Sequence, residues 1–87
     1  MTPELFAAHI LTLCRRHHAS VTSWIRSPNR NTLVGGRPNS YHLTGCAVDL
    51  ILDENANHAH FLADAQMLDL EVIDEGDHLH IEPAGPP

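Results

Sequence analysis

Residues 40–49 read Ser40-Tyr41-His42-Leu43-Thr44-Gly45-Cys46-Ala47-Val48-Asp49. Within this segment Asp49 stands out, because it lies in an otherwise apolar run that predicts a buried strand. A buried carboxylate needs a cation or several hydrogen-bond donors. His42 precedes Asp49 by seven residues, and Gly45 between them permits a sharp change of chain direction. We therefore expect His42, at the end of a loop, and Asp49, in the following strand, to face the same point.

A second group of histidines lies near the C-terminal end, in the segment Asp77-His78-Leu79-His80. His78 and His80 differ by two positions, so on a strand both side chains point to the same side of a sheet. This spacing suits either two metal ligands or one ligand with a helper. A catalytic zinc ion uses three protein ligands of the nitrogen or oxygen type and leaves one position for water. The donors predict a metal site, in which manganese or cobalt are further candidates.

Length and charge limit the function classes. The 87 residues suffice for one small domain, and no apolar run reaches the roughly 20 residues that a bilayer span requires. The net charge of −6 argues against nonspecific binding to DNA or RNA. Five arginines and one acidic residue lie in residues 1–45, whereas ten acidic residues lie in 46–87. This division suits a fold that pairs the two halves across one cleft.

The hydrophobic pattern predicts a mixed fold. In chain order we expect a helix over 3–18, a strand over 21–25, an irregular loop over 26–40, a strand over 46–52, a helix over 57–68, and strands over 70–73 and 78–82. This order lacks long crossover repeats and indicates an α+β fold with two helices and a small, mainly antiparallel sheet. We expect one domain over 1–82 and a flexible, proline-rich tail over 83–87.

The remaining histidines and the cysteines are interpreted as structural. Of the five histidines on the expected helices, four are predicted to be surface or edge residues: His17, His18, His58 and His60. Two cysteines, Cys14 and Cys46, are too few for a disulfide framework. We expect free thiols, because Cys14 lies on the apolar face of its helix, with a single bridge as the alternative.

Two motifs resemble a known family. Residues 40–49 have the form SxHxxGxAxD, and Asp77-His78-Leu79-His80 has a shortened DxHxH form. Together they resemble the zinc-dependent D-alanyl-D-alanine carboxypeptidases and L-alanyl-D-glutamate endopeptidases, which cut peptidoglycan peptides and share their fold with Hedgehog signalling domains. The segment Ser23-Trp24-Ile25-Arg26-Ser27-Pro28 looks like the family's S-G-Y-R-S-P stretch, although Trp24-Ile25 replaces its usual Gly-Tyr. The resemblance covers about residues 20–82.

The resemblance assigns roles by position. It implies one zinc ion, held by His42, Asp49 and His80. Cys46 stands where a basic residue is more common, and a thiol there is a possible competing ligand.

The same resemblance implies the catalytic groups. Asp77, three residues before the last ligand, matches the general base, with Glu75 as a competing candidate. His78 matches the auxiliary histidine, and Arg26 matches the arginine that steadies the substrate. Ser40 is a candidate for contacting the substrate or orienting the loop, with a turn-capping hydroxyl as the plainer interpretation.

These roles imply a zinc metallopeptidase that hydrolyses an amide bond in peptidoglycan stem peptides, of the carboxypeptidase or the endopeptidase (endolysin) type. The alternative is a non-catalytic zinc-containing binding or structural module of the same fold, for example in a bacteriophage particle. The N-terminus lacks the basic start of a secretory signal. We therefore expect a protein made in the cytoplasm, which degrades the cell wall after phage-type release or delivery. We also expect it to be a monomer.

Overall fold

A computed structural model describes residues 1–37 and 39–85 of the chain. The elements are α1 (Pro3–His17), β1 (Ala19–Ser23), α2 (Pro28–Leu33), the 3₁₀ helix η1 (Tyr41–Leu43), β2 (Val48–Leu52), α3 (His58–Met67), β3 (Leu70–Asp74) and β4 (Leu79–Pro83). The predictions for Pro38, in the irregular loop, and for the last two residues of the tail lie outside the described residues.

The four strands form one sheet in the order β1-β2-β4-β3, and every neighbouring pair is antiparallel. The predicted α+β class is therefore confirmed. Strand β2 pairs with β4 so that Asp49 lies directly opposite His80. This register brings the two motifs, which are far apart in the sequence, to one place in the sheet.

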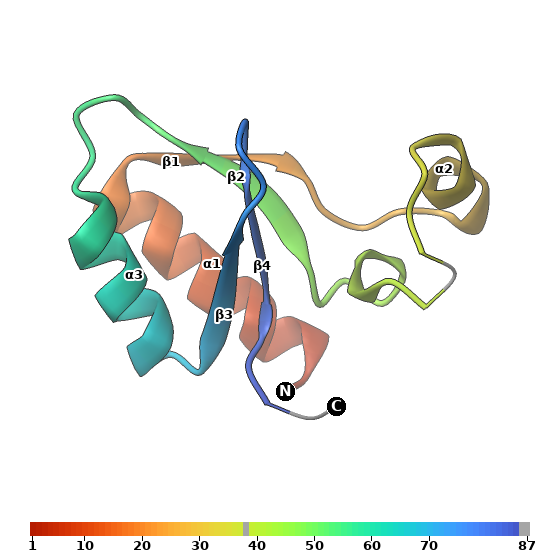
Figure 1. Cartoon of the computed structure of the whole chain (residues 1–87). Helices are drawn as coiled ribbons and strands as arrows, with labels where there is room; N and C mark the ends of the chain where they lie inside the picture. Colours follow the sequence, from red (N-terminus) through yellow and green to blue (C-terminus); the bar gives the residue numbers. More distant parts are fainter. Residues whose placement is uncertain (38, 86–87) are drawn as a thin grey trace.

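The core lies between the sheet and the helices α1 and α3, which are seen together in Figure 1. Alternate residues of the strands point toward these helices. Val48, Leu50 and Ile81 are fully buried against Phe6 of α1 and Phe61 of α3. The intervening residues point to the opposite face of the sheet. Asp49 and His80 are therefore placed away from the helices by the same alternation that builds the core.

The loop expected over 26–40 contains a third helix, so the prediction of two helices was incomplete. In α2 the hydroxyl of Ser27 accepts a hydrogen bond from the backbone N–H of Arg30, and Pro28 occupies the first turn. Because the residues of α2 are mostly polar, no apolar stripe revealed it. The 3₁₀ helix η1 begins in the same way, since Ser40 accepts from the N–H of His42. Local capping, rather than burial of an apolar face, forms both elements.

Several strand boundaries differ from the predicted ones. Strand β1 ends at Ser23, and Ile25, which was expected in the strand, is 74% exposed. Strand β4 reaches Pro83, which pairs with Leu70, so this strand runs one residue beyond its predicted end. Pro83 is tolerated because the pairing of β4 with β2 ends at Ile81, and no second neighbour requires an N–H from the proline.

His17 was expected near the surface, but the structure buries it between α1 and α3. Its Nε2 lies 2.6 Å from Oδ2 of Asp64, which also accepts a hydrogen bond from Arg16 at 3.2 Å. These hydrogen bonds, that from His17 above all, hold the pKa of the Asp64 carboxyl below its usual value. A buried histidine is stable here because a carboxylate from the neighbouring helix satisfies its ring nitrogen.

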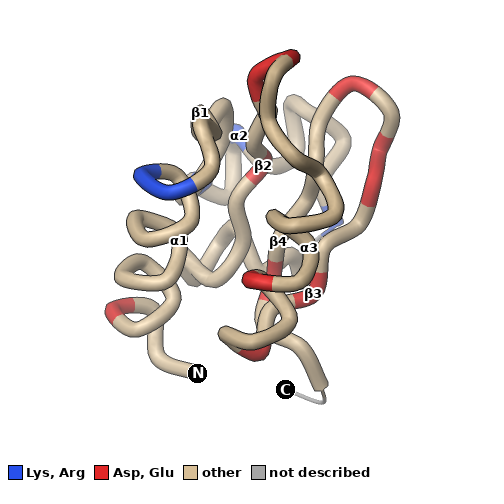
Figure 2. The backbone as a smooth tube through the Cα atoms, turned by 90° about the vertical axis from the view of Figure 1, so that its left-hand side faces the viewer, with Lys and Arg blue, Asp and Glu red and all other residues tan. Residues whose placement is uncertain are grey.

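The basic and acidic halves of the chain form ion pairs at two separate places rather than across one cleft. Arg16 pairs with Asp64 between α1 and α3, and Arg26 pairs with Asp49 at the sheet. Figure 2 shows a basic segment at the end of α1 and acidic segments on several turns. Cys14 and Cys46 are free, as expected. Within the described ranges, no helix is long and apolar enough to cross a membrane.

Candidate metal centre

Three side chains from three elements converge on the face of the sheet opposite the helices. His42 comes from η1, Asp49 from β2 and His80 from β4. Each offers one ligand atom, and these atoms lie within 4.8 Å of one another. In the part of the chain that the structure describes, no other group of three histidine, cysteine or acidic side chains is so arranged, and Cys46 does not belong to this one.

His42 is held by contacts on both sides. Its backbone N–H donates to the Ser40 hydroxyl, and its Nδ1 lies 2.7 Å from the carbonyl oxygen of Trp24. A carbonyl only accepts, so the ring proton is assigned to Nδ1 and the lone pair to Nε2. Nε2 lies 3.3 Å from Oδ1 of Asp49. Gly45, at a φ of 82°, makes the turn that brings β2 back beside η1.

The two oxygens of Asp49 have different neighbours. Oδ2 accepts a hydrogen bond from Nη2 of Arg26 at 3.2 Å, whereas Oδ1 faces the histidines. Arg26 is fixed in turn by Asn31, whose Oδ1 accepts from Nη1 at 3.3 Å. Asn31 is buried in α2 and also donates to the carbonyl oxygen of Arg37. The loop over 26–37 is thereby tied to one oxygen of Asp49.

His80 lies between two carboxylates. Its Nδ1 is 3.1 Å from Oδ1 of Asp49, and its Nε2 is 3.3 Å from Oε2 of Glu82. Ionised carboxylates only accept, and a neutral imidazole carries a single proton. Both contacts are therefore satisfied only when both ring nitrogens carry protons, or when a cation takes the place of the proton between His80 and Asp49.

The same conclusion follows at Oδ1 of Asp49, which faces the lone pair of His42 as well as His80. Oδ1 and the lone pair of His42 repel each other unless a proton or a cation lies between them. The nitrogen and oxygen donors, three in number, match the ligand set of a catalytic zinc ion. The residues present therefore fit a metal ion.

Asp77 and His78 form a pair beside this centre. Oδ1 of Asp77 lies 2.7 Å from Nδ1 of His78, whose Nε2 is 3.8 Å from Oδ1 of Asp49. The hydrogen bond between them raises the pKa of His78 and lowers the pKa of Asp77. The Asp77 side chain is 90% exposed and His78 is 30% exposed, so the pair lies on the open side of the centre. Glu75 is exposed and donates its N–H to the His78 carbonyl, and its negative charge adds a smaller rise to the pKa of His78 than the Asp77 hydrogen bond does.

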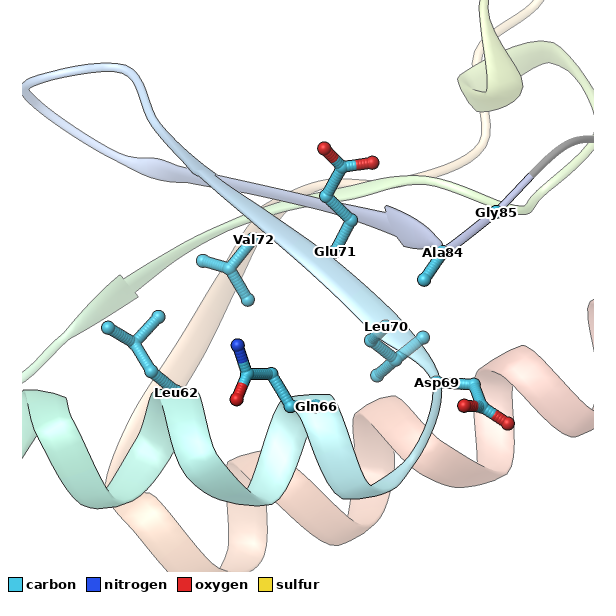
Figure 3. Close-up of a pocket in the computed structure, with 8 residues that line it drawn as sticks. All are labelled: Leu62, Gln66, Asp69, Leu70, Glu71, Val72, Ala84 and Gly85. Carbon is cyan, nitrogen blue, oxygen red and sulfur yellow. The ribbon is translucent and has the colours of Figure 1, made fainter.

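A wider hollow lies away from this centre. About 540 Å³ opens between α3 and β3, and Figure 3 shows its lining, which consists of Leu62, Gln66, Asp69, Leu70, Glu71, Val72, Ala84 and Gly85. None of these residues is a histidine or cysteine. A smaller hollow of about 150 Å³ is lined in part by Asp77 and His78. The convergence of donor atoms, rather than the size of a hollow, therefore locates the candidate site.

Two residues near the centre were missed by sequence reasoning. Glu82 follows His80 by two positions in β4, so the alternation that was used to relate His78 to His80 could have placed Glu82 on the same face. Asn31 had no comparable signal, because its importance depends on α2 packing against Arg26. Ser40, expected near the substrate, caps η1 and contacts the backbone of His42.

Comparison with known proteins agrees with the motifs. No curated protein and no solved structure matches the chain. A family profile, described as Peptidase M15, matches residues 6–82. The match runs from within α1 to within β4 and includes all the side chains of the candidate centre. The chain therefore belongs to the peptidase M15 family of zinc peptidases, to which the D-alanyl-D-alanine carboxypeptidases belong.

Proposed function

We propose that this protein is a zinc-dependent hydrolase of an amide bond in peptidoglycan stem peptides, of the D-Ala-D-Ala carboxypeptidase or the L-Ala-D-Glu endopeptidase type. The observation that carries the proposal is the convergence of His42, Asp49 and His80, with one side left open beside His78. Membership of the peptidase M15 family supports the same reaction class.

His42, Asp49 and His80 would hold the ion. When bound, zinc supplies a Lewis acid that activates water and polarises the scissile carbonyl. Arg26 keeps Oδ2 of Asp49 occupied, so Oδ1 is the oxygen presented to the centre. The Trp24 carbonyl keeps the proton of His42 on Nδ1 and leaves Nε2 free to bind.

Asp77 and His78 would handle protons and charge. The Asp77 carboxylate is ionised near neutral pH and can therefore accept a proton as a general base, and its hydrogen bond with His78 lowers its pKa. His78 directs Nε2 toward the centre, and its raised pKa favours the protonated form. In that form it can donate a hydrogen bond to the negative charge that develops on the carbonyl oxygen.

The test is mass spectrometry of purified peptidoglycan fragments after incubation with the zinc-loaded protein. Loss of a terminal D-Ala from the stem peptide would identify a carboxypeptidase. A cut between L-Ala and D-Glu would identify an endopeptidase. Intact fragments in the presence of verified bound zinc would contradict catalysis and favour the non-catalytic module of the same fold.

Two variants of the β3–β4 turn separate the candidate bases. We expect Asp77→Ala to lower turnover by about 10²- to 10⁴-fold, the usual contribution of a general base, while zinc binding is nearly retained. Glu75→Ala removes a carboxylate two residues away and should leave turnover close to that of the wild type. Loss of turnover in Glu75→Ala but not in Asp77→Ala would assign the base to Glu75. Loss of zinc from Asp77→Ala would identify Asp77 as a ligand.

A further inference from the structure

His80 is the one ligand candidate whose two ring nitrogens both face carboxylates among the described residues. Nδ1 lies 3.1 Å from Oδ1 of Asp49, and Nε2 lies 3.3 Å from Oε2 of Glu82. A neutral imidazole binds a metal through whichever ring nitrogen does not carry the proton. The partner that holds the proton therefore decides which nitrogen is free.

The position of Glu82 is set by the sheet. Glu82 and His80 are separated by one residue on β4, and Ile81 between them is fully buried on the helix side. Both side chains therefore emerge on the face that carries Asp49. They are largely shielded from solvent, with 16% of His80 and 23% of Glu82 exposed. A hydrogen bond in this setting is harder for water to replace than one on an open surface.

We propose that Glu82 is a positioning residue of the metal centre: it accepts the Nε2 proton of His80 and so directs the lone pair of Nδ1 toward the ion. This inference rests on the proposed zinc site. Glu82 would orient His80 as the Trp24 carbonyl orients His42, by accepting the proton of a ring nitrogen. The two histidines then present opposite nitrogens, Nε2 of His42 and Nδ1 of His80, and each is oriented by an acceptor on its far side.

The chain provides a matched control. Glu71 of β3 lies directly opposite Glu82 in the strand pairing. It is exposed and has no side-chain hydrogen bond within the described ranges. Replacing Glu71 removes the same charge from the same part of the sheet without touching His80. If the carboxylates attract a cation only through their charge, both replacements should weaken zinc binding. If Glu82 positions His80, only the replacement of Glu82 should weaken it.

The experiment measures zinc affinity by competition with a chromophoric chelator, using Glu82→Ala, Glu82→Gln and Glu71→Ala beside the wild type. We expect Glu82→Ala to weaken zinc binding by about 10- to 100-fold, as loss of such a partner usually does. Glu82→Gln keeps a carbonyl acceptor and should restore most of the affinity. Glu71→Ala should bind zinc as the wild type does. Equal affinity in Glu82→Ala and the wild type would overturn the inference.

A second measurement uses the wild type and therefore does not require any variant to fold. Nitrogen-15 NMR of the zinc-loaded wild type identifies which His80 ring nitrogen is protonated. We expect a protonated Nε2 and a metal-bound Nδ1, and binding through Nε2 would overturn the inference directly.

Failures at different levels are distinguishable. Tight zinc binding without peptide cleavage would contradict the proposed reaction and leave the role of Glu82 standing. A wild type that binds no zinc would overturn both.

Discussion

The two carboxylate oxygens of Asp49 have different neighbours: one contacts an arginine guanidinium, and the other faces the candidate metal position. Arg26 occupies Oδ2, while Oδ1 faces His42 and His80. Arg26 was expected to steady a substrate, and its observed contacts are with Asp49 and Asn31. Its direct action on a substrate stays a prediction, and the geometry adds an intramolecular role in orienting Asp49.

Gly36 lies so close to the side chains around this arginine that it leaves no room for a Cβ. A Cβ at this position would lie 2.0 Å from Oδ1 of Asn31, the atom that accepts from Arg26. We predict that Gly36→Ala displaces Asn31 and lowers the free energy of unfolding by about 1–3 kcal/mol, the usual cost of overpacking. Chemical denaturation measures this change.

The cause is tested by a double-mutant cycle with Asn31→Ala. If the clash with Asn31 is responsible, Gly36→Ala should cost much less once the Asn31 side chain has been removed. Additive losses would show instead that the backbone at Gly36 resists a side chain for another reason.

At the scale of elements, the helices α1 and α3 are joined by Asp64. Its carboxylate accepts from His17 and Arg16, and these hydrogen bonds hold its pKa below the usual value. A carboxyl with a lowered pKa in the folded state adds stability at pH values above its unfolded pKa. This stability is lost as the pH falls through the folded pKa.

We therefore predict that Asp64→Asn destabilises the protein at pH 7, and that the difference from the wild type shrinks as the pH falls below about 4, the pKa of an unfolded aspartate. Thermal unfolding across this pH range measures the effect. Asp53→Asn, in the exposed turn after β2, is the control and should change stability little at either end. A loss in Asp64→Asn that persists unchanged at pH 2–3 would contradict the assignment.

At the scale of the molecule, the candidate metal centre lies between segments that the core holds together only indirectly. The hydrophobic core joins α1, α3 and the sheet, whereas η1 contributes His42 and no residue to the core cluster. A bound ion would link η1 to β2 and β4. Because the chain is small, an ion that binds only the folded state is expected to contribute to folding.

We predict that a chelator lowers the melting temperature of the zinc-loaded protein. Free zinc at 1,000 times its dissociation constant would stabilise the folded state by about 4 kcal/mol. In His42→Ala, which lacks one ligand, the chelator should have a much smaller effect. An unchanged melting curve of the wild type, with removal of the metal verified by atomic spectroscopy, would rule out this contribution.

Much of this architecture is readable from residue patterns. Apolar residues at helical spacing, such as Phe6, Ile10 and Leu13, predicted α1, and all three are buried. The polar Asp49 within an apolar strand predicted a compensating partner, and the structure supplies Arg26 and two histidines. Periodicity and local capping act within a few residues, so a single sequence records them directly.

The tertiary structure alone decided which distant groups meet. The burial of His17 depends on Asp64, 47 residues later, and the anchoring of Arg26 depends on Asn31 in a helix without an apolar stripe. The pairing of β2 with β4 placed Asp49 opposite His80. A pattern shows which face of a strand or helix is buried. It does not show which polar group from another segment will satisfy that face, because this depends on packing among all the elements at once.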